Sequence, residues 1–189
     1  MHPVERLLTP LGKLFRNRHA DGSKSISHAP GLATENRITV TSPSFADGQE
    51  IPAKFCGRFI GDNISPALSW SPLPANAAHL LLIIEDLDSP GAVPRLHAVA
   101  EFPATMNGLD EGALTAEAKD ITFLSGRRGP LVYAGPRPLP GHGSHHYRFH
   151  LYALDSHVDL DRVSGVEELP AAASGHVLAS GVLTGTRES

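Results

Sequence analysis

The hydrophobic and polar positions of this chain divide it into two parts that meet near residue 36. From residue 37 onward, apolar and polar residues alternate with a period of two, as expected for strands that bury one face. The clearest alternations lie at 37–41, 96–102 and 147–154. The segment 80–85 (LLLIIE) is almost continuously apolar, which is typical of a central strand covered on both faces.

Clusters of turn-forming residues separate these runs. They lie at 42–48, 71–74, 89–94 and 135–143. Several strands with this spacing predict a mainly β fold, a two-sheet antiparallel β-sandwich with a few short helices. We expect the helices at 113–119 and 171–183, although Gly175 and Gly181 disfavour a helix in the second segment.

Residues 1–36 lack this alternation and are interpreted as an N-terminal extension of a domain that spans 37–189. Thr9 and Pro10 suit the N-cap and the first position of a short helix. Small polar residues with Gly and Pro at 20–36 predict a linker.

The expected helix would be amphipathic, because Leu11, Leu14 and Phe15 would share one face. We favour packing of this face on the domain or on the second subunit of a homodimer. Contact of the same basic amphipathic helix with an anionic membrane surface is the alternative.

Composition narrows the class of protein. The chain has 189 residues, enough for one domain, and its 18 glycines and 16 prolines indicate a loop-rich fold. A net charge of −4 argues against nucleic acid as a partner. Cys56 is the only cysteine, so an intrachain disulfide is excluded. The sequence shows no secretory signal and no apolar run of about 18 residues, so we expect a cytoplasmic protein without a transmembrane segment.

The first cluster with chemical potential follows the apolar strand. Asp86 and Asp88 are two residues apart, so alternation places them on one face. Symmetric pairing about the turn at 89–94 would bring Asp86 opposite His97, where a carboxylate orients the imidazole and favours its protonated form. Capping of the turn is the alternative role, above all for Asp88.

The second cluster is the segment 133–147, where three prolines and three glycines precede a strand. Loops of this kind bring backbone N–H groups close to a ligand and form concavities that bind anions. The strand register puts His145 and Tyr147 on one side and His146 on the other, with His142 in the loop.

Two enzymatic interpretations of these clusters are disfavoured. His142, His145 and His146 with nearby aspartates suggest zinc, but no HExxH or similar spacing supports a metal site. Ser144 lies beside two histidines, yet it has no GxSxG context, and adjacent strand residues do not form a triad with one another. We therefore expect no metal, no cofactor and no catalytic residue.

Three ordered segments carry a family resemblance. Residues 63–70 (NISPALSW), 86–90 (DLDSP) followed by His97, and 133–147 followed by FHLYALD at 149–155 match motifs of one family. Over roughly residues 37–186 the chain resembles the phosphatidylethanolamine-binding protein family, in its bacterial Raf-kinase-inhibitor-like branch.

The resemblance implies a sandwich with a small surface cavity for phosphate-like or carboxylate anions. In this cavity two histidines would donate hydrogen bonds to the anion, and aspartates would orient them and favour their charge. The residues implied by position are Asp86, Asp88, Pro90, His97, Gly135, His145 and Tyr147.

Departures from the family pattern concern the walls of this cavity. A proline and an aromatic residue of the family pattern are replaced by Leu87 and Ala98. A second proline and a tyrosine are replaced by Leu139 and Thr186. Arg137 stands where a small residue is usual. Pointing inward it would add a bidentate donor for an anion, and pointing outward it would be an ordinary solvated side chain.

The sequence therefore favours a non-enzymatic binding protein whose ligand is a small anion or a phospholipid head group. An inhibitor or regulatory partner of a kinase or protease is the alternative, since members of the family are described in those roles. A metal or serine hydrolase is the third and least favoured hypothesis.

Overall fold

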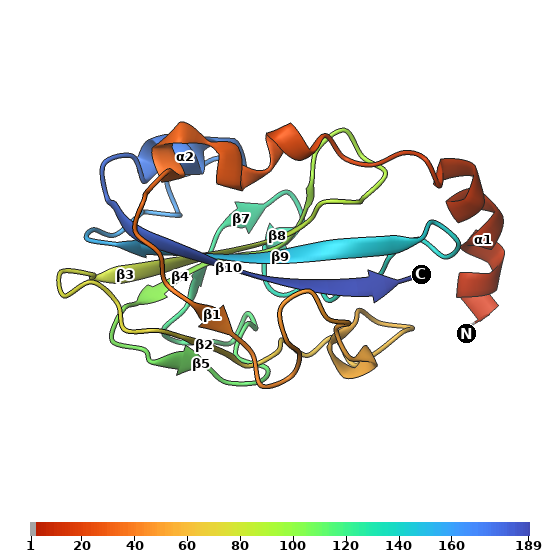
Figure 1. Ribbon diagram of the computed structural model, residues 1–189, viewed down its shortest axis with the longest axis horizontal. Helices are drawn as coiled ribbons and strands as arrows, with labels where there is room; N and C mark the ends of the chain where they lie inside the picture. The colour runs from red at the N-terminus through yellow and green to blue at the C-terminus, as the bar shows by residue number, and fades with distance from the viewer. Residues whose placement is uncertain (1–2) are drawn as a thin grey trace.

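The central sheet of the computed structural model, which describes residues 3–189, has five antiparallel strands in the order β10-β9-β3-β4-β6 (Figure 1). Their bounds are β3 His79–Asp86, β4 Arg95–Pro103, β6 Thr122–Phe123, β9 Ser144–Leu154 and β10 Val177–Glu188. A second antiparallel sheet consists of β1 Val40–Thr41, β2 Leu68–Trp70 and β5 Gly108–Leu109. A hairpin is formed by β7 Ser125–Gly126 and β8 Gly129–Pro130. The predicted mainly β sandwich is confirmed.

The helices are short. They are α1 Pro3–Phe15, α2 Leu169–Ala172 and the 3-10 helices η1 Gly22–Lys24, η2 Ile26–His28, η3 Pro30–Leu32, η4 Ala53–Phe55 and η5 Val166–Glu168. Between residues 3 and 189 no helix has both the length and the apolar character needed to cross a membrane.

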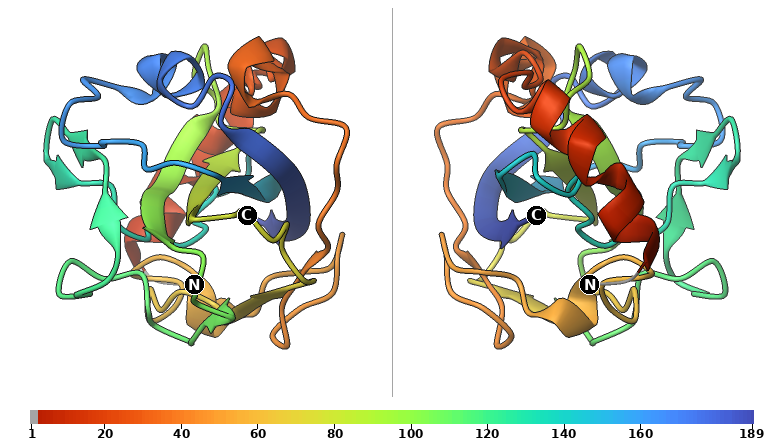
Figure 2. Two further views of the ribbon diagram at one scale, coloured as in Figure 1. Left: turned by 90° about the vertical axis from the view of Figure 1, so that its left-hand side faces the viewer. Right: turned by 90° about the vertical axis from the view of Figure 1, so that its right-hand side faces the viewer.

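The central strand β3 is buried on both faces, which explains its apolar sequence. Leu80, Leu82 and Ile84 belong to the core between the two main sheets. Leu81 and Ile83 belong to a second core, which lies on the other face of the central sheet. Figures 1 and 2 show η1–η3 and α2 covering that face.

The segment expected to be a linker contributes to this second core. Residues 22–32 form three consecutive 3-10 helices, and Ile26 and Leu32 are buried among the side chains of the central sheet. The Ser25 hydroxyl and the Ile26 N–H both donate to the buried carboxylate of Glu85. The linker prediction is wrong here, because two buried apolar side chains and two hydrogen bonds attach the segment to the sheet.

Helix α1 differs from the prediction in both its start and its orientation. It begins at Pro3, so Thr9 is not its N-cap, and Pro10 lies inside the helix. Proline has no N–H to donate there. The Thr9 hydroxyl donates back to the Glu5 carbonyl over 3.1 Å. The predicted apolar face packs on the domain only in part, since Leu11 is 41% and Leu14 74% exposed while Phe15 is half-buried.

The side of α1 that packs on the domain carries Glu5 and Gly12. A Cβ on Gly12 would lie 1.9 Å from the Pro140 carbonyl oxygen, so the helix backbone contacts the loop before β9 directly. Figure 2 shows α1 crossing the end of the central sheet.

The two helices predicted in the C-terminal half are also wrong. Residues 113–119 form turns, and 171–183 contains only the end of α2 before β10 begins. Gly175 breaks the helix with a φ of +83°. Gly181 lies against residue Ile38, where a Cβ would come within 2.3 Å of the carbonyl oxygen. Pairing of β10 with β9 along its length therefore overrides the local helical pattern.

Candidate anion-binding pocket

The ends of three central strands and the loop before β9 form a pocket of about 380 Å³ beside α1. Asp86 ends β3, Arg95 and His97 begin β4, and His145 begins β9. The full set of lining residues is Leu8, Gly57, Asn63, Asp86, Ser89, Pro90, Arg95, His97, Ala134, Gly135, Arg137, Pro138, Leu139, Pro140 and His145. Six of the eight predicted site residues are among them.

A β-bulge determines where His97 lies. The register between β3 and β4 shifts after Ile84, which pairs with Ala98, while Asp86 pairs with Arg95. The predicted pairing of Asp86 with His97 is wrong, because the turn spans residues 87–94 and is centred one residue earlier than the segment 89–94 about which symmetric pairing was assumed. His97 instead lies beside Tyr147, whose ring it meets edge-on at a centroid distance of 5.1 Å.

The buried ring of His97 has one nitrogen engaged and one facing no partner. Nδ1 donates to the carbonyl oxygen of Ala134. Nε2 makes no hydrogen bond with any residue between 3 and 189. Burial lowers the pKa of His97, and this outweighs the Ala134 carbonyl and the charge of Asp86, which raise it. The balance favours the neutral ring, contrary to the expected protonated form, because the Asp86 carboxylate hydrogen bonds to His145 and not to His97.

His145 has a partner on each ring nitrogen. Its Nδ1 lies 2.8 Å from a carboxylate oxygen of Asp86, and its Nε2 lies 2.8 Å from Nδ1 of His142. The remaining nitrogen of His142 donates to the Arg18 carbonyl over 2.9 Å. Both ring nitrogens of His145 are thus engaged within the protein. His145 therefore has no free donor for an anion, contrary to the expectation that both histidines donate.

Asp88 and Tyr147 do not line the pocket. The Asp88 carboxylate accepts from the backbone N–H and the ring of His146 over 2.7 and 2.8 Å. It therefore points to the side of β9 opposite His145, and the expectation that it shares a face with Asp86 is wrong because β3 has ended. Tyr147 is buried beneath the ring of His97, and burial raises the pKa of its hydroxyl.

Gly135 and Asn63 fix the loop that forms the far wall. A Cβ on Gly135 would lie 2.3 Å from the Phe55 carbonyl oxygen, so this position has room only for glycine. The Gly135 N–H donates to the side chain of Asn63 over 2.8 Å, and the Asn63 amide donates to the Tyr133 carbonyl over 3.3 Å. Sequence reasoning used Asn63 only as part of a motif and missed this role.

Arg137 lies at the mouth of the pocket, and α1 supplies its counter-charge. Its guanidinium contacts the carboxylate of Glu5 over 2.8 and 3.2 Å and lies over the ring of Phe59 at 4.7 Å. Glu5 is buried, and Leu8 of the same helix lines the pocket. Helix α1 therefore holds one of its own carboxylates where an anion would meet Arg137.

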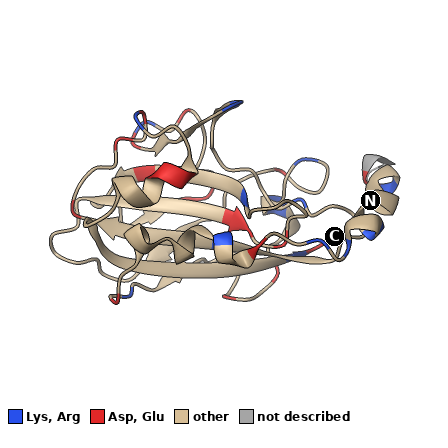
Figure 3. Cartoon of the chain, turned by 90° about the horizontal axis from the view of Figure 1, so that it is seen from above, with Lys and Arg blue, Asp and Glu red and all other residues tan. Residues whose placement is uncertain are grey.

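Arg95 is a second cation that sequence reasoning missed. It lines the pocket, is exposed, and forms no ion pair with any residue of the described chain. Its charge is close enough to contribute to lowering the pKa of His97. The lysines and arginines of α1 lie at this end of the molecule as well (Figure 3). The sequence signal that could have identified Arg95 was its place at the start of β4, beside the predicted cluster.

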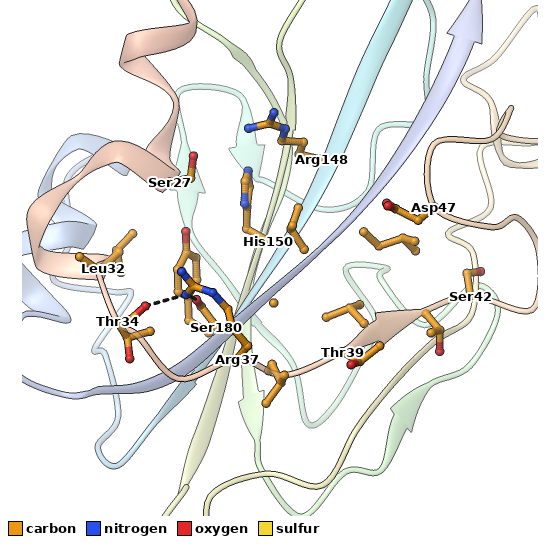
Figure 4. Close-up of a pocket in the computed structure, with 18 of the residues that line it drawn as sticks. Ser27, Leu32, Thr34, Arg37, Thr39, Ser42, Asp47, Arg148, His150 and Ser180 are labelled. Atoms are coloured by element: carbon orange, nitrogen blue, oxygen red, sulfur yellow. Dashed lines mark hydrogen bonds between the residues drawn. The ribbon is translucent and has the colours of Figure 1, made fainter.

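A larger groove, of about 860 Å³, runs along β10 and contains none of the predicted residues. In Figure 4, Arg148 and His150 of β9 face Ser27 across it, and Arg37 lies beside Ser180. Arg37 already donates to the Thr34 carbonyl and the Ser180 hydroxyl over 2.6 and 2.9 Å. The groove shares no lining residue with the pocket beside α1. The buried imidazoles and carboxylate of that pocket make the pocket the stronger candidate site.

The sequence model of the phosphatidylethanolamine-binding protein family matches residues 41–188. This chain belongs to that family. A Methanothermobacter thermautotrophicus relative, a UPF0098 protein, is 37% identical over 150 residues, which cover 78% of this chain and 97% of the relative.

Two solved structures resemble the fold. The crystal structure of CT736 from Chlamydia trachomatis, described as a phosphatidylethanolamine-binding protein homologue, has a TM-score of 0.70 and 31% identity, covering 82% of this chain and 99% of CT736. YbcL of E. coli has a TM-score of 0.72 and 23% identity, covering 81% of this chain and 99% of YbcL, and shares the fold.

Proposed function

We propose that this family member is a non-enzymatic binding protein for a small phosphate-like or carboxylate anion, free or as a lipid head group. One observation carries the proposal. The buried Nε2 of His97 has no partner in the described chain and belongs to a pocket that Arg95 and Arg137 also line. A buried polar atom without a partner is costly, so a ligand atom that pairs with it gains free energy.

The neutral state of His97 determines how an anion binds. With its proton on Nδ1, the ring offers a lone pair at Nε2, so it accepts from a ligand O–H such as that of hydrogen phosphate. A fully ionised ligand instead draws a proton onto Nε2, because its negative charge favours the imidazolium. Arg95 and Arg137 supply guanidinium donors suited to phosphate or carboxylate oxygens.

The nearby carboxylate of Asp86 does not prevent anion binding. It is 4% exposed and hydrogen bonded to the His145 ring, so it does not face a ligand as an unpartnered carboxylate. Ser144, considered above as a nucleophile, is exposed and does not line the pocket. The arrangement of these residues supports binding better than hydrolysis.

The proposal is tested by NMR of the imidazole nitrogens during titration with phosphate and with phosphorylethanolamine. We expect the His97 signals to shift with saturable binding, and His97→Gln, which lacks these signals, to bind phosphate more weakly in calorimetry. The matched control is His146→Gln, because His146 is an exposed histidine paired with Asp88 outside the pocket. Unchanged His97 signals at millimolar concentrations of both ligands would overturn the proposal.

A further inference from the structure

The end of the central sheet opposite the pocket gathers two histidines and one glutamate. His79 begins β3 and pairs with Pro103 at the end of β4 and with Leu154 at the end of β9. Glu101 lies near the end of β4, and His157 follows β9 in the next loop. Antiparallel pairing therefore brings together three residues that are far apart in the sequence.

The ligand atoms of these residues face one another. Nδ1 of His79 lies 3.5 Å from Oε1 of Glu101, and Nδ1 of His157 lies 2.9 Å from Oε2. The available ligand atoms of all three side chains lie within 4.8 Å of one another. Ligand atoms of a tetrahedral zinc ion, with bonds of about 2.0–2.1 Å, are about 3.4 Å apart. The separations within the cluster, from 2.9 Å to at most 4.8 Å, span this value.

Burial distinguishes Glu101 from an ordinary surface carboxylate. Glu101 is 2% exposed, and its Oε1 accepts the Val158 N–H over 2.7 Å. Its Oε2 accepts no well-directed hydrogen bond from the described residues, although Nδ1 of His157 is close. A buried carboxylate oxygen without a hydrogen bond is costly, so a cation that pairs with Oε2 gains free energy.

We propose that His79, Glu101 and His157 form a binding site for a divalent transition metal ion of the zinc class. Two imidazole nitrogens and one carboxylate are a donor set that suits this class. The side chain of His157 is 52% exposed, which leaves room on that side for water as a further ligand. The bound ion holds the loop after β9 against β3 and β4.

This site differs from the zinc ligands considered from the sequence. His142 and His145 hydrogen bond to each other, while His146 turns away to Asp88. Sequence reasoning missed the new cluster because its residues show no local motif. Only the pairing of β3 with β4 and β9 places them together.

The test is a titration of the metal-free full-length chain with Zn²⁺ in competition with a chromophoric chelator. We expect one equivalent to bind, and His79→Gln and His157→Gln each to weaken binding by at least about tenfold. The matched control is His176→Gln, because His176 is a half-exposed histidine that pairs with a single carboxylate, Asp155. The control should bind Zn²⁺ as the unaltered chain does.

Two further measurements keep the result independent of folding. Co²⁺ should give visible d–d bands in the unaltered chain that are lost in His157→Gln, whose exposed side chain can be replaced without exposing core. Zn²⁺ should raise the melting temperature of the unaltered chain and of His176→Gln, but not of His157→Gln. The proposal is overturned if Zn²⁺ does not bind, or if it binds all four proteins equally.

Discussion

At the scale of single residues, His97 links the stability of the fold to the chemistry of the pocket. Its pKa is lowered by burial, so the folded chain binds less proton at this site than the unfolded chain, whose histidine titrates near 6.5. The stability that follows from the neutral ring is complete above that value. It is lost as the pH falls from about 6.5 toward the lowered pKa.

We therefore expect His97→Gln to reduce the acid sensitivity of folding. Urea unfolding at pH 7.5 and 5.5 should give a smaller loss of stability in the variant than in the unaltered chain, because glutamine does not titrate. The other histidines contribute equally to both proteins, so the difference isolates His97. An equal loss in both would contradict the assignment.

Gly135 gives a second prediction at this scale. Gly135→Ala places a Cβ 2.3 Å from a backbone carbonyl oxygen that has no flexible side chain to move. We expect a loss of stability of about 1–3 kcal/mol, measured by urea unfolding. The control is Gly22→Ala, because nothing lies within 4 Å of its Cβ position. A loss as large in the control would show that the close approach is not the cause.

The site residues were predictable where strand alternation or a motif applies. Asp86, His97 and His145 lie in the pocket as expected. Their mutual contacts were not predictable, because the turn begins directly after Asp86 and places Arg95, not His97, opposite it. The role of His142 was missed because it also depends on the carbonyl of the distant residue Arg18, and Arg95 was missed although its place at the start of β4 is visible in the sequence.

At the scale of elements, α1 is a wall of the pocket that competes with the proposed ligand. Glu5→Gln removes the carboxylate that contacts Arg137 and leaves the helix and Leu8 in place. We expect affinity for phosphate to rise about fivefold, which corresponds to ~1 kcal/mol, measured by calorimetry.

The control for this variant is Glu117→Gln, which removes the same charge at an exposed position. It separates the loss of the Glu5 contact from a general change in net charge. If phosphate binds both variants with equal affinity, Glu5 does not compete for the pocket.

The contact between η2 and β3 predicts a pH-dependent stability. Burial alone would raise the pKa of Glu85, but hydrogen bonds from His150, Ser25 and the Ile26 N–H outweigh it, and the pKa is lowered. The stability from these bonds is present above the ordinary value of about 4.5 and is lost as the pH falls through the lowered pKa.

Glu85→Gln should destabilise the chain by about 1–3 kcal/mol at pH 7, measured by urea unfolding. The difference from the unaltered chain should shrink below pH 4.5, because the native carboxyl then also becomes neutral. A difference that is independent of pH would indicate lost packing and not a lost charge.

Elements with strong periodicity were predictable, and elements fixed by distant contacts were not. The strand β3 is apolar on both faces and matches its prediction within one residue at each end. The segment 171–183 has locally helical composition, but β9 offers a partner strand along most of its length. The free energy gained by pairing with β9 outweighs the local preference of this segment for a helix.

At the scale of the whole molecule, the central sheet separates two sites. The anion pocket lies at the end where β3 stops, and the His79, Glu101 and His157 cluster lies at the end where β3 begins. The fold was predictable from alternation and family motifs. The attachment of residues 22–32 was not, because their polar composition conceals two buried apolar side chains.

Truncated chains test the domain boundary that the sequence predicts at residue 36. Removing residues 1–18 takes away α1 and its Glu5 but keeps Ile26 and Leu32, so this variant should remain folded and bind phosphate more tightly. Removing residues 1–36 exposes the second core. Since losing a single buried Leu or Ile side chain costs about 2–5 kcal/mol, we expect this variant to lose at least about 4 kcal/mol in urea unfolding. Equal stability of the two truncated chains would place the boundary at residue 36 after all, and would mean that the 3-10 helices cover the sheet without stabilising it.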